Sequence, residues 1–178
     1  LRPSLPINNP MKPKETKSIK NFLKPRAGAI RQGYFKPANP DKYVGDPTQI
    51  IFRSSWEFKF LKWCDSSPTI VAYSSEPVGI LYYSPLDKRG HTYYVDFYIV
   101  TKDNDGNEQK WLIEVKPNKY VKPPTAPDRM TNKQTANYVY AAKQYIINQA
   151  KFDAARDFAA QRGLKFGIIT ENFLFKSI

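Results

Sequence analysis

The chain has 178 residues, and its 41% hydrophobic content is typical of a globular domain with a hydrophobic core rather than of a disordered protein. Lysine and arginine number 28 against 16 aspartates and glutamates, so the formal net charge of +12 favours a polyanionic partner, with nucleic acid ahead of an anionic membrane surface. One cysteine and one histidine exclude an internal disulfide and a His/Cys zinc site, so any metal must be held mainly by oxygen ligands.

The first 32 residues differ in composition from the rest of the chain. Prolines recur through them, and basic residues far outnumber acidic ones. Two interpretations remain open, a solvated and partly disordered tail or an arm that becomes ordered on a partner protein or on DNA. We therefore predict a basic, proline-rich N-terminal arm over residues 1–32 and one folded domain over residues 33–178.

The folded domain is expected to open with a loop and a helix. Residues 33–46 are interrupted by prolines and glycines and predict a loop. Ser54 is followed three positions later by Glu57, ahead of an apolar run, which is the capping-box pattern of a helix start. Residues 65–68 end the helix. One of its faces carries three aromatic residues at helical spacing, Trp56, Phe60 and Trp63.

Strands and a long helix are expected after this first helix. Four segments rich in Val, Ile and Tyr predict strands over residues 69–73, 78–83, 92–100 and 110–115. Residues 103–107 predict a hairpin turn between the last two. A long helix follows over residues 132–161 with Gly163 as its cap, and a final strand spans residues 164–170. This order predicts an α/β fold with a mixed central sheet flanked by helices.

Three charged residues in the apolar strands indicate chemistry. Glu114 and Lys116 are two positions apart, so on a strand both side chains project from the same face. Asp96 interrupts an apolar strand, and counting outward from the hairpin turn places it opposite about Val115, beside Glu114 and Lys116. Two carboxylates this close repel each other, and Mg²⁺ is the natural cation to stabilise them. A bound metal lowers the pKa of a water molecule for phosphodiester hydrolysis, with Lys116 orienting that water or stabilising charge.

A less specific interpretation also has to be considered. An Asp, a Glu and a Lys near strand ends are often surface ion pairs worth ~0–1 kcal/mol. The apolar neighbours of Asp96 and Glu114 favour the catalytic interpretation, because charges inside such strands are costly unless they have a function. Glu57 likewise has two roles that do not exclude each other, as the capping-box glutamate or as a further metal ligand. Contacts with DNA are expected from five further residues: Arg53, Lys119, Lys122, Gln149 and Lys151.

Short motifs from Gly33 onward resemble, in matching order, the head completion nucleases of tailed phages. They include Gly-Tyr-Phe-Lys-Pro at residues 33–37, Arg-Ser-Ser-Trp-Glu at 53–57, Tyr-Val-Asp-Phe-Tyr at 94–98 and Ile-Glu-Val-Lys-Pro at 113–117. The same pattern, a helical Glu, then Asp, then Glu-x-Lys on a hairpin, resembles the wider PD-(D/E)xK superfamily. A more distant resemblance is to the TnsA-type endonuclease subunit of transposons.

The resemblance implies a restriction-endonuclease-like fold with Glu57, Asp96, Glu114 and Lys116 as the catalytic set. Asp96, Glu114 and Glu57 would hold Mg²⁺, for which Mn²⁺ can substitute. The substrate would be double-stranded DNA, packaged or at the portal and neck, before the tail attaches. The expected locations are the head–neck region of the virion and, during assembly, the host cytoplasm.

The expected protein partners are portal, neck or capsid proteins, contacted through the N-terminal arm, and no membrane partner is expected. Two alternatives remain open, a neck or head-closure protein that binds DNA without cutting it, and a transposase-like subunit that cuts only within a complex. The presence of all four expected site residues favours an active nuclease over the first of these, because a degenerate nuclease usually loses a ligand or the lysine.

Overall fold

The computed structural model describes residues 32–128 and 131–175. The predicted arm therefore lies outside the described residues, except for Gln32. The strands are β1 Gly33–Tyr34, β2 Ile51–Phe52, β3 Ile70–Ser75, β4 Gly79–Ser84, β5 Arg89–Tyr94, β6 Phe97–Lys102, β7 Glu108–Val115 and β8 Lys165–Ile169. The helices are α1 Ser55–Ser66, α2 Asn132–Ala160, α3 Glu171–Leu174 and the short 3₁₀ helices η2 Pro40–Lys42 and η3 Asn118–Tyr120.

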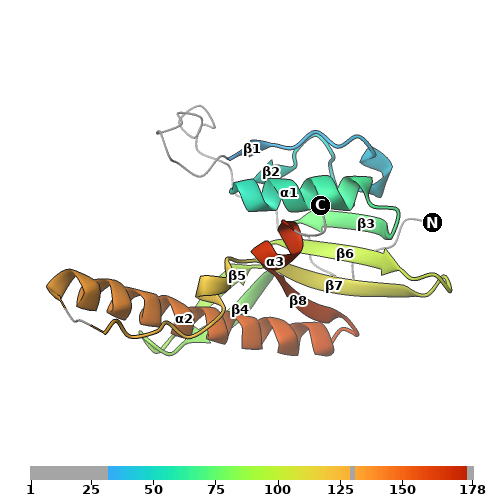
Figure 1. Cartoon of the computed structure of the whole chain (residues 1–178). Helices are drawn as coiled ribbons and strands as arrows, with labels where there is room; N and C mark the ends of the chain where they lie inside the picture. The colour runs from blue at the N-terminus through green and yellow to red at the C-terminus, as the bar shows by residue number, and fades with distance from the viewer. Residues whose placement is uncertain (1–31, 129–130, 176–178) are drawn as a thin grey trace.

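A four-stranded mixed sheet lies at the centre of the domain, in the order β3-β6-β7-β8. Its first three strands are antiparallel neighbours, and β8 runs parallel to β7. Helix α1 and the short α3 cover one face, while α2 and the two-stranded sheet of β4 and β5 cover the other (Figure 1). The predicted α/β fold with a mixed central sheet between helices is therefore confirmed.

Both faces of the central sheet are apolar because both are covered. Along β6, Phe97 and Ile99 belong to the core beneath α1, whereas Tyr98 and Val100 belong to the core beneath α2. The same alternation along β7 places Leu112 on the α2 side, and Glu114 projects from that face as well. The central strands therefore present their one buried carboxylate toward α2.

Helix α1 begins at the predicted capping residue. The Ser54 hydroxyl accepts a hydrogen bond from the Glu57 backbone N–H at 3.1 Å. The Glu57 carboxylate closes the turn, but it accepts from the Arg53 backbone N–H at 2.7 Å and from the Ser54 hydroxyl at 2.8 Å. The predicted helix start is confirmed, with the reciprocal bond one residue earlier than a strict capping box requires.

Helix α2 spans nearly the predicted residues and is held at both ends by local sequence. Thr131 and Gln134 form a full capping box, and Gly163 follows the helix with φ +66°, a conformation that glycine adopts without strain. Among the described residues, burial on this helix begins at Asn148. The first half of α2 is therefore a surface helix, and its N-terminal end projects past the central sheet in Figure 1.

Two predicted segments were wrong. Residues 33–46 are not only loop, because β1 pairs with β2 and η2 follows. The buried Asp65 carboxylate fixes this segment by accepting from the backbone N–H groups of Ala38 and Asn39 at 2.8 and 3.0 Å. Such a contact joins residues far apart in the chain, so the local pattern carries no signal of it.

The predicted strand over residues 92–100 is in fact two strands in different sheets. Strand β5 pairs with β4, whereas β6 pairs with β3 and β7, and the chain bends between them at Val95 and Asp96. The run contains no glycine or proline, and Asp96 is interpreted from the sequence as a functional residue inside one strand rather than as a sign of a break. Asp96 therefore lies at a bend and not within a strand. Among the described residues, no helix is apolar enough over a sufficient length to cross a lipid bilayer.

Candidate active site at the end of the β6–β7 hairpin

The β6–β7 register brings Asp96 beside Glu114. Phe97 pairs with Ile113, so the preceding residue lies level with Glu114, one position from the predicted partner Val115. The turn forms as predicted, with Asp103 accepting from two backbone N–H groups and Gly106 at φ +88°. Two backbone contacts hold Asp96, because its Oδ2 accepts from the Val115 N–H and its carbonyl accepts from the Glu76 N–H, both at 2.8 Å.

The two carboxylates are shielded from solvent to different extents, with Glu114 buried and Asp96 half-buried. Glu114 is 3% exposed, and its Oε2 has no hydrogen-bond partner among the described residues. Burial raises the pKa of Asp96 well above its ordinary value, and the nearby charge of Glu114 raises it further, while the bond from the Val115 N–H opposes both. An acidic pair in this environment has more negative charge than its surroundings stabilise.

Lys116 supplies part of the missing positive charge. Its Nζ lies 2.8 Å from Glu114 Oε1. Burial alone would lower the pKa of Lys116, but the charge and hydrogen bond of Glu114 outweigh it, so the pKa is raised and the amine stays protonated. The predicted cluster of Asp96, Glu114 and Lys116 therefore forms.

A second lysine approaches the acidic pair from α2. The Lys151 Nζ lies 5.6 Å from the ring centres of Tyr82 and Tyr93. Burial lowers the pKa of Lys151, and the charge of Lys116 lowers it further, while Glu114 and Asp96 act in the opposite direction. Lys151 was expected to contact DNA, and the structure places it within electrostatic reach of the acidic cluster.

Tyr93 is the residue of this cluster that the sequence did not indicate. It is buried on β5, and burial together with the Glu114 charge raises the pKa of its hydroxyl. That hydroxyl faces the Glu114 carboxylate, although neither it nor Glu114 Oε2 forms a hydrogen bond of good geometry with the described residues. Tyr93 lies in β5, which pairs with β4 and not with the central sheet. Its place at the site leaves no signal in the sequence, because a tyrosine in a strand is usually an ordinary core residue.

Glu57 lies within electrostatic reach of the acidic pair, because its charge raises the pKa of both Asp96 and Lys116, but its carboxylate is engaged elsewhere. Its carboxylate oxygens accept from the Arg53 backbone N–H and the Ser54 hydroxyl, just before α1 begins. In the part of the chain that the structure describes, no group of three or more Asp, Glu, His or Cys side chains is close enough to hold a metal ion. The geometry therefore offers two carboxylates to a metal rather than the expected three, and Mg²⁺ binds through one or two carboxylates plus waters and phosphate.

The other expected DNA contacts have different surroundings. Arg53 forms a two-point salt bridge to Glu76, with distances of 2.7 and 3.0 Å. Gln149 donates to the Val121 carbonyl at 3.3 Å, so it fixes the loop after η3. Lys119 and Lys122 are exposed around η3, close to the acidic site along the chain. The structure thus leaves these two lysines accessible and engages Arg53 and Gln149 within the protein.

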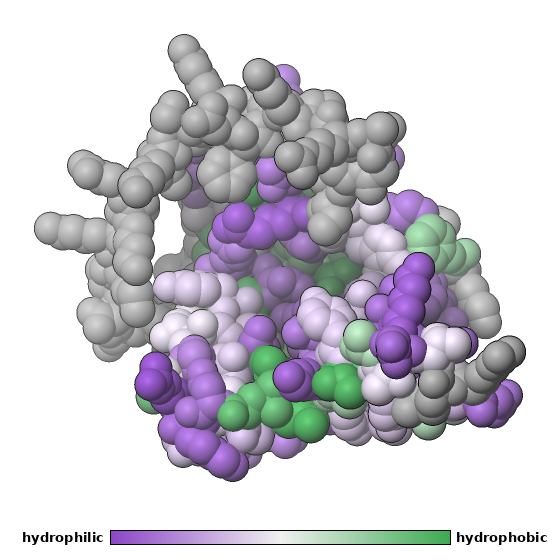
Figure 2. Space-filling model, turned by 90° about the vertical axis from the view of Figure 1, so that its left-hand side faces the viewer, coloured by the Kyte–Doolittle hydropathy of each residue, from purple (hydrophilic) through white to green (hydrophobic). Residues whose placement is uncertain are grey.

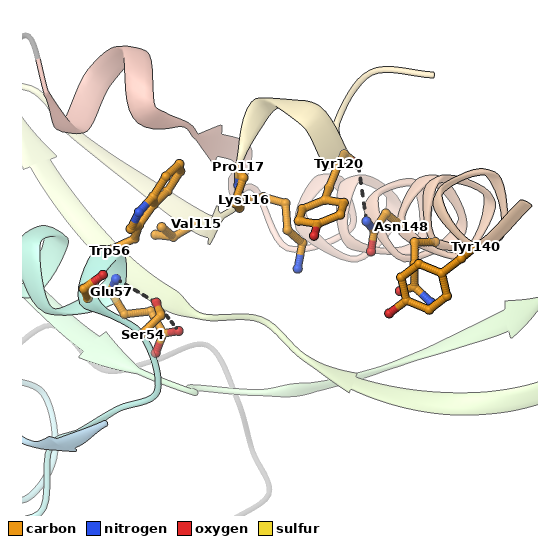
Figure 3. Close-up of a pocket in the computed structure, with 11 residues that line it drawn as sticks. Ser54, Trp56, Glu57, Val115, Lys116, Pro117, Tyr120, Tyr140 and Asn148 are labelled. Atoms are coloured by element: carbon orange, nitrogen blue, oxygen red, sulfur yellow. Dashed lines mark hydrogen bonds between the residues drawn. The ribbon is translucent and has the colours of Figure 1, made fainter. Parts of the chain in front are cut away.

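A pocket of about 410 Å³ opens beside Lys116. It lies between the N-terminus of α1, the end of β7, η3 and the first half of α2 (Figure 3). Its walls include Trp56 on one side and Tyr120 and Tyr140 on the other. The face of the molecule in Figure 2 is hollowed near its centre, where hydrophilic residues line the recess.

Replacing Glu57 separates its two roles, because glutamine keeps the capping geometry but loses the charge. We expect Glu57→Gln to unfold at nearly the wild-type temperature and Glu57→Ala to lose about 1 kcal/mol of unfolding free energy. If Glu57 also serves the reaction, Glu57→Gln should cut DNA about tenfold more slowly than wild type. Equal cutting by wild type and Glu57→Gln would restrict Glu57 to the cap.

Comparisons with known proteins agree with this geometry. Residues 67–171 match the family model described as TnsA-like endonuclease N terminal, a range that contains Asp96, Glu114 and Lys116. The chain is 36% identical over 142 residues to the head completion nuclease of Enterobacteria phage T4, which covers 80% of this chain and 92% of that protein. No solved structure matches the chain.

Proposed function

We propose that this chain, which belongs to the TnsA-like endonuclease N-terminal family and is related to the head completion nuclease of phage T4, is a head completion nuclease that hydrolyses phosphodiester bonds in DNA. The observation that supports this most is the pair of half-buried Asp96 and buried Glu114, with Lys116 bound to Glu114. A purely structural neck protein has no use for two desolvated carboxylates side by side, which cost folding free energy.

A divalent metal fits this acidic pair. Glu114 Oε2 is buried without a hydrogen-bond partner of good geometry among the described residues, and burial beside Glu114 raises the pKa of Asp96. Both observations suit an oxygen-binding cation such as Mg²⁺, held by Asp96 and Glu114. When bound there, the metal supplies a water molecule of lowered pKa and a Lewis acid for the phosphoryl oxygen.

The side chains around the pair have separate roles in this proposal. The Val115 N–H orients the Asp96 carboxylate, and Lys116 stabilises charge as it develops on the phosphate. Lys151 contributes a second positive charge from α2 on the side of Tyr82 and Tyr93. Asp96 followed by Glu114-x-Lys116 fits the PD-(D/E)xK pattern, with Glu57 as a capping residue near the site.

The biological setting is part of the same proposal. The relative's name places it in head completion, so we place this protein on packaged DNA or at the portal and neck before tail attachment. Its protein partners would then be portal, neck or capsid proteins, with the basic residues 1–32 as the contacting arm. It would be found in the head–neck region of the virion and, during assembly, in the host cytoplasm.

The test is cleavage of supercoiled and linear DNA by the full chain with Mg²⁺, with Mn²⁺ and with a chelator. We expect cutting with either metal, none with chelator, and none by Glu114→Gln, which should still bind DNA in a salt-sensitive way. Cutting that persists in Glu114→Gln would place the chemistry elsewhere. Tight binding without any cutting would favour the structural neck protein.

A further inference from the structure

The pocket beside Lys116 has few charged side chains for a site on so basic a protein. Among the described residues that line it, Lys116 and Glu57 carry the only charges, although the protein as a whole has a net charge of +12. Lys116 is itself engaged by Glu114 at 2.8 Å. The N-terminus of α1 and Lys116 can hold a phosphate at one edge of the pocket, whereas the rest of the lining is uncharged and suits another part of a nucleic acid.

Aromatic rings and amides make up much of the remaining lining. Trp56 and Tyr120 contribute partly buried rings, and Tyr140 is a ring that is 62% exposed. Gln144 and Asn148 add amide groups from the same face of α2. Rings that stack and amides that bond to an edge are the features by which proteins hold unpaired nucleobases.

The wall that carries Tyr120 is fixed before any ligand arrives. Asn148 donates its side-chain N–H to the Tyr120 carbonyl at 3.2 Å, and the Asn118 backbone N–H donates to Glu171 Oε2 at 2.8 Å. The Lys119 amine lies 4.8 Å from the centre of the Tyr120 ring, at the exposed side of η3. A base held in the pocket would thus have a lysine near its own phosphate.

We propose that this pocket accepts an unpaired nucleobase next to the cleaved bond, so that the preferred substrate is DNA with unpaired nucleotides, as in single strands, forks or frayed ends. The inference rests on the proposed nuclease function and names its substrate class. A base inside a paired duplex is stacked and must be extruded before it can enter a pocket, whereas an unpaired base enters at little cost. The position of the pocket at Lys116 couples this recognition to the acidic pair.

Binding without cleavage tests the pocket independently of catalysis. In chelator, the full chain is titrated with a short thymidine single strand and with the same strand in which abasic sites replace several bases, which keeps the phosphates. We expect wild type to bind the strand with bases about tenfold more tightly. Tyr140→Ala should lose this difference, and Tyr140→Phe should keep it. Tyr83→Ala is the matched control, because Tyr83 is 61% exposed on β4 outside the pocket.

Cleavage then tests the substrate class. With Mg²⁺, a forked duplex should be cut about tenfold faster than the fully paired duplex of the same sequence, and Tyr140→Ala should remove that preference. Equal binding of the two single strands by wild type, or Tyr140→Ala behaving as Tyr83→Ala does, would overturn the base pocket in favour of backbone binding. If wild type cuts nothing, the nuclease proposal fails, and the binding comparison still decides the pocket.

Discussion

Replacing Asp96 with asparagine should reduce DNA cleavage by about 1,000-fold, because a metal ligand supplies several kcal/mol of transition-state stabilisation. The fold should survive, since the asparagine carbonyl oxygen can still accept from the Val115 N–H that Asp96 Oδ2 now engages at 2.8 Å. The measurement is the rate of supercoiled DNA nicking with Mg²⁺ alongside the dissociation constant for the same DNA in chelator. Loss of cutting with unchanged binding is the expected combination.

The same variant should be more stable than wild type in chelator at neutral pH. Burial and Glu114 raise the pKa of Asp96, so ionised Asp96 destabilises the folded state. The sign follows from linkage. In acid, below the Asp96 pKa of about 3.9 in the unfolded chain, Asp96 is protonated in both states and costs the fold nothing. As the pH rises from there through the raised pKa of Asp96 in the folded protein, the folded state loses stability relative to the unfolded state. The gain from Asp96→Asn should therefore be small in acid and grow toward neutral pH in thermal unfolding. A variant that unfolds earlier than wild type at every pH would contradict the charge burial on which the site assignment rests.

Lys116→Met is expected to damage both catalysis and stability. Methionine keeps the apolar stem of lysine but leaves Glu114, which is 3% exposed, without its cation at 2.8 Å. We expect the variant to lose about 2–3 kcal/mol of unfolding free energy in chelator, because breaking a buried pair leaves an uncompensated charge. Cutting should fall by about 100-fold or more, as when a charge-stabilising group is removed.

Adding metal to Lys116→Met distinguishes its two effects. Mg²⁺ at the acidic pair should restore much of the lost stability, by mass action and by replacing the missing charge, while cutting stays low. Lys102→Met is the control, since Lys102 is exposed at the far end of β6 and should change neither quantity. Wild-type cutting by Lys116→Met would remove this lysine from the mechanism.

The sequence carried enough information for the acidic cluster because local rules determine it. The spacing of Glu114 and Lys116 fixes their common face, and the hairpin turn fixes the register that brings Asp96 to them. Glu57 was equally visible as the cap of α1, since capping needs only neighbouring residues. Each of these features involves residues that are close in the chain or joined by one tight turn.

The parts that the sequence did not reveal depend on contacts between distant segments. The break between β5 and β6 depends on strand pairing, because β5 pairs with β4 whereas β6 pairs with β3 and β7. Lys151 reaches the site only because α2 packs on the face from which Glu114 projects. The pocket draws its rings from α1, η3 and α2, so no stretch of sequence contains its pattern.

The bend at Asp96 also makes the position of this carboxylate independent of the length of the β4–β5 hairpin. The Glu76 and Val115 N–H groups tie Asp96 to the chain before β4 and to β7, so its position does not depend on how far the β4–β5 hairpin extends. The tip of that hairpin, residues 85–88, is exposed. Exposed tips are where chains tolerate insertions, so the hairpin can be lengthened at residues 85–88 without moving the acidic pair. The tip of this hairpin is thus a place where new contacts can be added near an unchanged acidic pair.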